Sequence, residues 1–122
     1  MSKEKLSEII KSPLSELSKL KIGLLVRATL PQILKLELIS EVEVKNMTKD
    51  DYSKMIFDMN YPILKLIDEN ISINENRTVG DYTRYYAEPF DYDNSRYLIS
   101  SEWYDRSQED YIRWLKRKVK IE

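Results

Sequence analysis

A single aromatic stretch limits the possible folds of this chain more than any other feature. Residues 84–104 (RYYAEPFDYDNSRYLISSEWY) hold seven of its thirteen aromatic side chains. Between Arg96 and Trp103 the residues alternate as in a β-strand, and one predicted face carries Tyr97, Ile99, Ser101 and Trp103. Because an isolated hairpin is only marginally stable in water, we expect this face to pack against helices.

The turn of the predicted hairpin lies at Asp93 and Asn94. Short polar side chains bond to their own backbone in turns, and Asn tolerates a positive φ. A two-residue turn there places Phe90 opposite Tyr97. Pro89 cannot donate to a strand ladder, so its strand should be an edge strand or should bend at that point. The sequence therefore predicts a two-stranded wing.

The chain before the hairpin carries helix signals. Residues 2–11 form a short amphipathic segment, and Ser12 followed by Pro13 is a typical helix start. Pro31 disfavours the helical conformation of the residue before it, so we expect a kink or a break there. The helix between these two prolines should be the most buried one, with a leucine stripe at Leu14, Leu17, Leu20 and Leu24.

Two further short helices are predicted before residue 60. Ser40 and Glu43 form a capping box that favours a helix over residues 40–47, although the alternation of residues 41–44 is also compatible with a strand. Thr48 begins a second helix in the same way. It should end near residue 59 and bury Tyr52, Met55, Ile56 and Met59.

The remaining segments complete the predicted fold. An apolar stretch covers residues 63–67, and residues 68–83 are polar and irregular, as in a mobile loop. Ser107 should cap a closing helix with an apolar face of Tyr111, Trp114 and Leu115. We therefore expect an α+β fold, mostly helical, in one domain spanning residues 1–122: a winged-helix-like bundle with one β-hairpin and a C-terminal helix.

The composition excludes several classes of function. Lys and Arg number 20 and Asp and Glu 21, so overall charge gives no argument for nucleic acid. The absence of Cys excludes disulfides and zinc fingers, and the absence of His excludes the usual catalytic triads. The start lacks a signal peptide, and no apolar run of about 18 residues exists. We expect a cytoplasmic protein without a cofactor, a small-molecule substrate or a membrane partner.

Several sequence strings point to a more specific setting. FDMNYPILKLI, RYYAEPF, YLISSEWY and the closing WLK resemble a small module of bacterial and phage proteins. That module occurs alone and at the ends of larger proteins linked to DNA restriction. The resemblance covers about residues 17–116. It implies a prokaryotic, DNA-linked setting and assigns no functional residue.

A winged helix would use the second of the two short helices to read bases in the major groove. The side chains available for this are Lys49, Ser53 and Lys54, with Asn60 as a further candidate at the end of the helix. Residues 41–58 carry five acids against three bases, however, and phosphates would repel such a surface. The alternative is that both helices only pack the core.

The other candidate contacts to nucleic acid are basic residues near the hairpin and in the last helix. Arg84 and Arg96 belong to the hairpin region, and the last helix adds Arg113, Lys116 and Arg117, followed by Lys118 and Lys120. Such clusters bind phosphates without reading sequence. The alternative is a solvated helix end whose cations match the helix dipole.

A catalytic interpretation is the most remote. Glu43-Val44-Lys45 matches the acid-x-Lys half of a metal-dependent nuclease site, but no suitable upstream acid accompanies it. We therefore expect no enzyme. The leading hypothesis is a non-enzymatic binding module, a nucleic-acid-linked accessory protein. The alternative is a protein–protein interaction or dimerisation domain. A joined basic surface would favour the first, and an exposed apolar patch the second.

Overall fold

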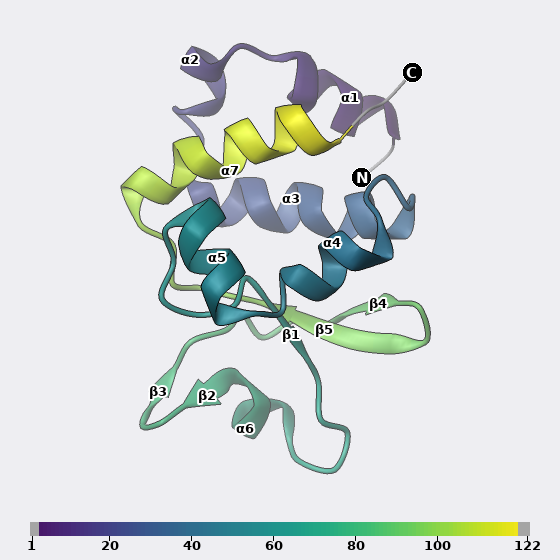
Figure 1. The fold of residues 1–122 in the computed structure, drawn as a ribbon, viewed down its shortest axis with the longest axis vertical. Coiled ribbons are helices and arrows are strands. Elements are labelled where there is room, and N and C mark those ends of the chain that lie inside the picture. The colour runs from purple at the N-terminus through teal and green to yellow at the C-terminus, as the bar shows by residue number, and fades with distance from the viewer. Residues whose placement is uncertain (1–2, 120–122) are drawn as a thin grey trace.

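Helices dominate the chain, and its short strands lie between the fifth and the last helix (Figure 1). The computed structural model describes residues 3–119 and is α+β. Its elements in chain order are α1 (Lys3–Lys11), α2 (Leu14–Leu17), α3 (Ile22–Lys35), α4 (Glu41–Asn46), α5 (Asp50–Phe57), β1 (Leu64–Leu66), α6 (Ile73–Arg77), β2 (Thr78–Val79), β3 (Tyr82–Thr83), β4 (Phe90–Tyr92), β5 (Ser95–Ile99) and α7 (Asp105–Lys118).

The predicted hairpin is confirmed, with its register. Phe90 of β4 pairs with Tyr97 of β5, and the turn residues Asp93 and Asn94 have φ of 49° and 63°. The prediction of only two strands is wrong. β1 pairs antiparallel with the other side of β5, which gives a three-stranded sheet in the order β1-β5-β4. The sequence signal for β1 was weak because the strand has only three residues.

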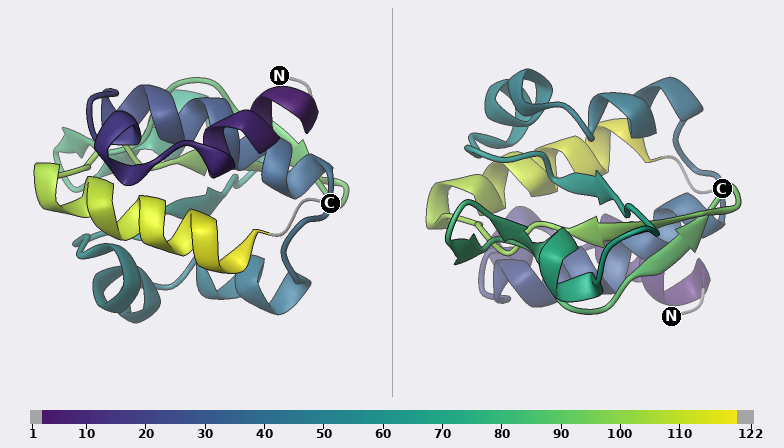
Figure 2. Two further views of the ribbon diagram at one scale, coloured as in Figure 1. Left: turned by 90° about the horizontal axis from the view of Figure 1, so that it is seen from above. Right: turned by 90° about the horizontal axis from the view of Figure 1, so that it is seen from below.

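The two faces of this sheet are covered by different parts of the chain. Tyr97 and Ile99 face the main core formed with the helices, which confirms the predicted packing of that face. Leu98 points to the opposite side and packs with Ile67 and Tyr85 in a second, smaller core. Seen from below, α6, β2 and β3 lie in front of the sheet, on the side away from α3 (Figure 2).

Helices α3 and α7 form the centre of the main core. Six residues of α3 are buried, and only part of this helix coincides with the one predicted to be the most buried, since α3 begins at Ile22 and continues past Pro31. On α7 the predicted apolar face is confirmed, since Tyr111, Trp114 and Leu115 are fully buried. The Tyr111 hydroxyl lies 2.7 Å from the Thr29 hydroxyl of α3, so the one polar group of that ring has a partner.

The predicted long leucine helix is broken in two. α2 ends at Leu17 and α3 starts at Ile22, which leaves Leu20 and Leu24 exposed rather than in the core. The carbonyl oxygens of Leu17 and Leu20 accept hydrogen bonds from Gln108 Nε2 of α7 at 3.0 and 2.5 Å. This distant side chain satisfies backbone groups that a continuous helix would have paired internally.

Pro31 does not break the helix that contains it. α3 continues from Ile22 to Lys35, although proline removes one internal hydrogen bond at a typical cost of about 3 kcal/mol. Leu30, Ile33 and Leu34 on either side are all buried. Packing of these three side chains outweighs the local preference of proline.

The cap predictions for α4, α5 and α7 have mixed outcomes. Ser40 caps α4, because its Oγ accepts from the Glu43 N–H at 3.1 Å, so the helix rather than the strand is confirmed. Thr48 is not a cap: its hydroxyl donates to the Lys45 carbonyl at 2.6 Å, and α5 starts at Asp50. α7 begins two residues before Ser107, with Tyr104 at the cap position.

The face and the end of α5 also differ from the prediction. Met55 is exposed, while Ser53 and Phe57 are buried. The helix ends at Phe57 because Asp58 takes the left-handed conformation, with φ of 54°, two residues earlier than expected.

The segment predicted as an irregular loop holds regular structure. Ser72 caps α6 by accepting from the Glu75 N–H at 3.1 Å. β2 and β3 then pair across a turn in which Gly80 has φ of 63°, a conformation that glycine adopts without strain. These elements are only two to five residues long, so their sequence pattern was too short to detect.

Candidate functional site

The eight side chains predicted to contact nucleic acid lie on separate parts of the molecule. Arg84 and Arg96 lie in and near the strands, whereas three others belong to α7, which is on the other side of the sheet from α6 (Figure 1). The full predicted set is Lys49, Ser53, Lys54, Arg84, Arg96, Arg113, Lys116 and Arg117. α5, which contains Ser53 and Lys54 and has Lys49 at its cap position, packs against α7, but Arg84 and Arg96 belong to neither helix, so the predicted set does not form one joined surface.

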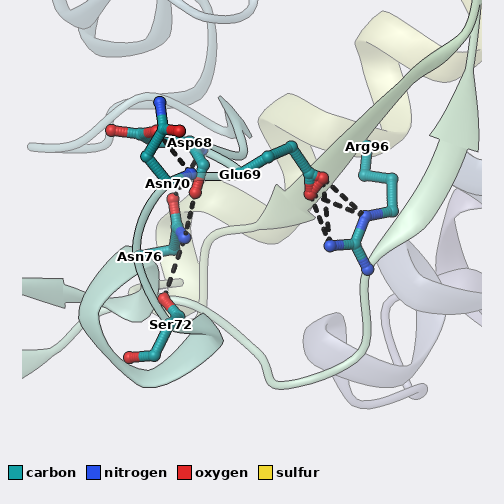
Figure 3. Close-up of polar contacts among 6 residues, drawn as sticks. All are labelled: Asp68, Glu69, Asn70, Ser72, Asn76 and Arg96. Atoms are coloured by element: carbon teal, nitrogen blue, oxygen red, sulfur yellow. Dashed lines mark hydrogen bonds and ion pairs between the residues drawn. The ribbon is translucent and has the colours of Figure 1, made fainter.

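Both arginines of the hairpin region are paired with carboxylates. Arg84 Nη1 lies 2.6 Å from Glu102 Oε1, and this bond raises the pKa of the guanidinium. Arg96 binds both oxygens of the Glu69 carboxylate, at 2.5 Å in the closest contact, and lowers the pKa of that carboxyl (Figure 3). A phosphate would have to compete with these partners.

The cations of α7 are also engaged within the chain. Arg113 lies 3.1 Å from Glu109 and 3.5 Å from Asp110 on the same helix. Lys116 Nζ donates to the carbonyls of Ile10 and Ser12 at 2.7 and 2.6 Å, so it holds the end of α1. Arg117 is exposed, and Lys120 lies outside the described residues.

The side chains predicted to read bases differ in their burial and in their bonding partners. Ser53 is fully buried, and its hydroxyl accepts from the Ile63 N–H at 3.0 Å. The expectation that it lies on the surface is therefore wrong. Lys54 lies 3.5 Å from Asp58 and is exposed, as is Lys49. Ser53 is a buried link between α5 and the start of β1.

Glu43 belongs to a buried polar cluster. Its Oε1 accepts from Trp114 Nε1 at 2.8 Å and from the Tyr52 hydroxyl, while Lys118 lies 3.9 Å from Oε2. Burial and the bond to Glu43 raise the pKa of Tyr52. Within residues 3–119, no three acidic side chains are grouped so that they could hold a metal ion. The arrangement around Glu43 links α4, α5 and α7.

A different surface feature lies along the outer edge of β1. A groove of about 460 Å³ runs between the start of α5 on one side and β2 on the other. It is lined by Thr48, Asp50, Asn60, Tyr61, Pro62, Leu64, Lys65, Leu66, Val79 and Tyr85. Leu66 is 53% exposed and Val79 is 37% exposed, so the groove presents apolar side chains to solvent.

The ladder of hydrogen bonds shows which backbone groups of β1 face this groove. The Ser100 N–H donates to the Ile63 carbonyl at 3.0 Å, and the Ile67 N–H donates to the Arg96 carbonyl at 2.9 Å. In an antiparallel pair the bonded residues alternate along the strand. The N–H and carbonyl of Leu66, between these positions, therefore point away from β5 and towards the groove.

On either side of Leu66 along this edge, outward N–H groups are already bonded. The Leu64 N–H donates to the Met47 carbonyl at 3.1 Å. At the other end the Asn76 carboxamide pairs with Asp68, accepting from its N–H at 2.8 Å and donating to its carbonyl at 3.0 Å (Figure 3). In the part of the chain that the structure covers, Leu66 has no such partner on this side.

The charged side chains of the groove differ in their pairing. Lys65 Nζ donates to the Asn76 carbonyl and lies 5.6 Å from the centre of the Tyr85 ring. The Tyr85 hydroxyl donates to the Pro62 carbonyl at 3.0 Å, and burial raises the pKa of this phenol, with the nearby Asp50 carboxylate adding to the rise. Asp50 itself is exposed and forms no ion pair with any of the side chains that the structure describes.

None of the groove residues was among the predicted contacts. The sequence showed an apolar stretch at residues 63–67, in which Leu64, Lys65 and Leu66 alternate as in a strand. That alternation was the available signal for an edge strand. Nothing in it indicated which strand edge would stay open.

Comparisons with known proteins give no relative from which a function could be transferred. No family model matches the chain, and neither a curated protein nor a solved structure is significantly similar to it. The resemblance to a DNA-linked bacterial and phage module therefore stays a prediction. None of the helices described between residues 3 and 119 is long and apolar enough to span a lipid bilayer.

Proposed function

We propose that the chain is a non-enzymatic interaction module that binds a short extended segment of a partner protein at the edge of β1. The supporting observation is Leu66, whose N–H and carbonyl face the groove between two bonded positions. An extended peptide has the complementary groups, since peptides commonly bind by adding to an exposed strand edge. The exposed side chains of Leu66 and Val79 supply apolar contact beside this pairing.

The bonded neighbours of Leu66 argue for a separate peptide rather than a second copy of the chain. Two β1 strands paired antiparallel about Leu66 would place Leu64 of one copy opposite Asp68 of the other. The outward N–H of Leu64 is already bonded to Met47, and both outward groups of Asp68 are bonded to Asn76. A flexible segment can pair with Leu66 and then bend away, whereas a strand inside another folded copy cannot.

A variant that removes one hydrogen-bond donor tests this proposal. Leu66→Pro deletes an N–H that takes no part in the ladder with β5, and proline is tolerated on edge strands. Leu66→Val keeps the N–H with a side chain of similar size and is the matched control. Peptides selected from a displayed random library on the wild-type chain would be titrated against both variants by NMR.

The expected result is a loss of affinity confined to the proline variant. One main-chain hydrogen bond contributes about 0.5–1.5 kcal/mol, so binding to Leu66→Pro should weaken roughly two- to twelvefold relative to Leu66→Val. The Leu66 amide should also show the largest shift on binding to the wild type. Equal affinities for both variants, or no selectable peptide, would refute the proposal.

Nucleic-acid binding is the second candidate, and one observation favours it. The Arg84 guanidinium lies between two rings, 5.1 Å from the centre of Tyr61 and 4.9 Å from that of Tyr82. Tyr82 is 65% exposed, and exposed rings can stack on unpaired bases. This candidate includes two expectations from the sequence. One is a winged-helix arrangement with Lys49 and Lys54 directed at DNA, and the other is a cytoplasmic, bacterial or phage setting.

A salt titration of DNA affinity separates the two candidates. Arg113 and Arg117 are the useful pair to replace by Gln, because replacing Lys116 would also release the end of α1. If both contact phosphates, the slope of log affinity against log salt should flatten by about two units for duplex DNA. An absence of binding to duplex and single strands at low salt would exclude this candidate for the chain as it stands.

A further inference from the structure

The charged side chains along the groove indicate which kind of residue the partner segment should carry. Two ionisable side chains of opposite sign line it, Lys65 and Asp50. The Lys65 ammonium is engaged by the Asn76 carbonyl and the Tyr85 ring. Asp50 is exposed, and it forms no ion pair with any side chain that the structure describes. The two formal charges balance, but Lys65 already has partners in the groove, whereas the Asp50 carboxylate has none among the described side chains and is the group left for a ligand.

The cation nearest in sequence does not neutralise this carboxylate within the groove. Lys49 lines a separate hollow together with Asp51, Tyr52 and Met55. Asp50 contributes to the groove on the side of α5 instead, close enough to Tyr85 to raise the pKa of that phenol. A ligand in the groove would meet the Asp50 carboxylate and not the Lys49 ammonium.

Strand geometry indicates which residue of the segment would meet Asp50. Side chains of directly paired residues lie on the same face of a sheet. Leu66 shares its face with Leu64, which packs in the main core, and α5 lies on that side. The neighbours of the pairing residue would point to the other face, where α6 and β2 carry the exposed Val79.

We infer that the partner segment carries a lysine or arginine at the residue that pairs with Leu66, flanked by apolar residues. This inference rests on the proposed function and adds the chemistry of its ligand. The basic side chain reaches the Asp50 carboxylate, and an apolar neighbour covers Val79. The ion pair is exposed, so it sets the preference among segments more than the strength of binding.

Three peptides that differ at one position test the inference. TVKVT, TVEVT and TVQVT would each be titrated into the labelled wild-type chain, into Asp50→Asn and into Asp50→Lys, with NMR shifts read at Leu66 and Val79. An exposed ion pair contributes about 0.2–1 kcal/mol, so the wild type should prefer the lysine peptide over the glutamine peptide by up to about fivefold. The preference should shrink at high salt.

The variants make each outcome decisive. Asp50→Asn should bind all three peptides about equally, and Asp50→Lys should prefer the glutamate peptide. Equal binding of the three peptides by the wild type, or failure of all three where library-selected peptides do bind, would overturn the charge inference and leave the proposed function standing. Loss of the difference between Leu66→Pro and Leu66→Val would instead overturn the proposed function.

Discussion

Replacing Asn76 by Ala tests whether one buried side chain organises the segment between β1 and β2. Asn76 is fully buried, and its carboxamide accepts from the Asp68 N–H at 2.8 Å. It also donates to the carbonyls of Asp68 and Ser72, at 3.0 and 2.9 Å. Each such bond contributes about 0.5–1.5 kcal/mol net, so three amount to about 1.5–4.5 kcal/mol. Ala favours the helix by about 0.5 kcal/mol relative to Asn, which reduces the expected loss of stability.

The expected free-energy loss for Asn76→Ala is therefore about 1–4 kcal/mol, measured by urea unfolding. Amide hydrogen exchange supplies a local readout, because the Asp68 N–H loses its acceptor and should exchange faster. Asn74→Ala is the matched control: Asn74 lies in the same helix and is exposed, so its replacement should change stability by less than about 0.5 kcal/mol. An Asn76→Ala protein as stable as this control, with Asp68 still protected, would refute the reasoning.

Two other features give predictions of the same kind. Glu43→Ala removes the acceptor of the fully buried Trp114 indole N–H and should cost about 1–3 kcal/mol, whereas Glu43→Gln keeps an acceptor oxygen and should cost less. Equal melting temperatures for Glu43→Gln and Glu43→Ala would contradict this. Arg96→Gln should raise the pKa of Glu69 towards its ordinary value, as followed by NMR. Arg96 lowers the pKa of Glu69 in the folded state. The stabilising effect of this ion pair is therefore present above the ordinary carboxyl pKa and is lost as pH falls through the lowered value. An unchanged pKa of Glu69 in the variant would exclude the pairing in solution.

The hairpin could be predicted because its signals are local. Asp93 and Asn94 specify the turn, and the turn fixes which residues of β4 and β5 face each other. β1 could not be predicted in the same way, since Leu64 pairs with a residue far along the chain. A three-residue strand has no pattern of its own strong enough to indicate such a partner.

The errors in the helices have a similar origin. A leucine stripe with regular spacing suggested one long helix, but the break after Leu17 is held by Gln108, a residue of the last helix. Pro31 has a strong local preference that buried neighbours override. Both outcomes depend on tertiary contacts, and spacing along the sequence contains no information about them.

The candidate site shows the same limit. Arg84 and Arg96 were selected because basic side chains attract phosphates, yet their carboxylate partners lie 18 and 27 residues away in sequence. Only the folded arrangement shows that these charges are compensated. The groove beside Leu66 likewise depends on which strand lies at the edge of the sheet, and the edge is decided by the topology as a whole.

The bonds from Lys116 to the end of α1 have a consequence for the order in which the protein acquires its structure. Lys116 and Ser12 are 104 residues apart, and ribosomes add about 5–20 residues per second. α1 can pack against α3 before that, but the bonds from Lys116 to its end form only about 5–20 s after Ser12 has been added to the chain. The end of α1 is therefore fixed only once α7 has been synthesised.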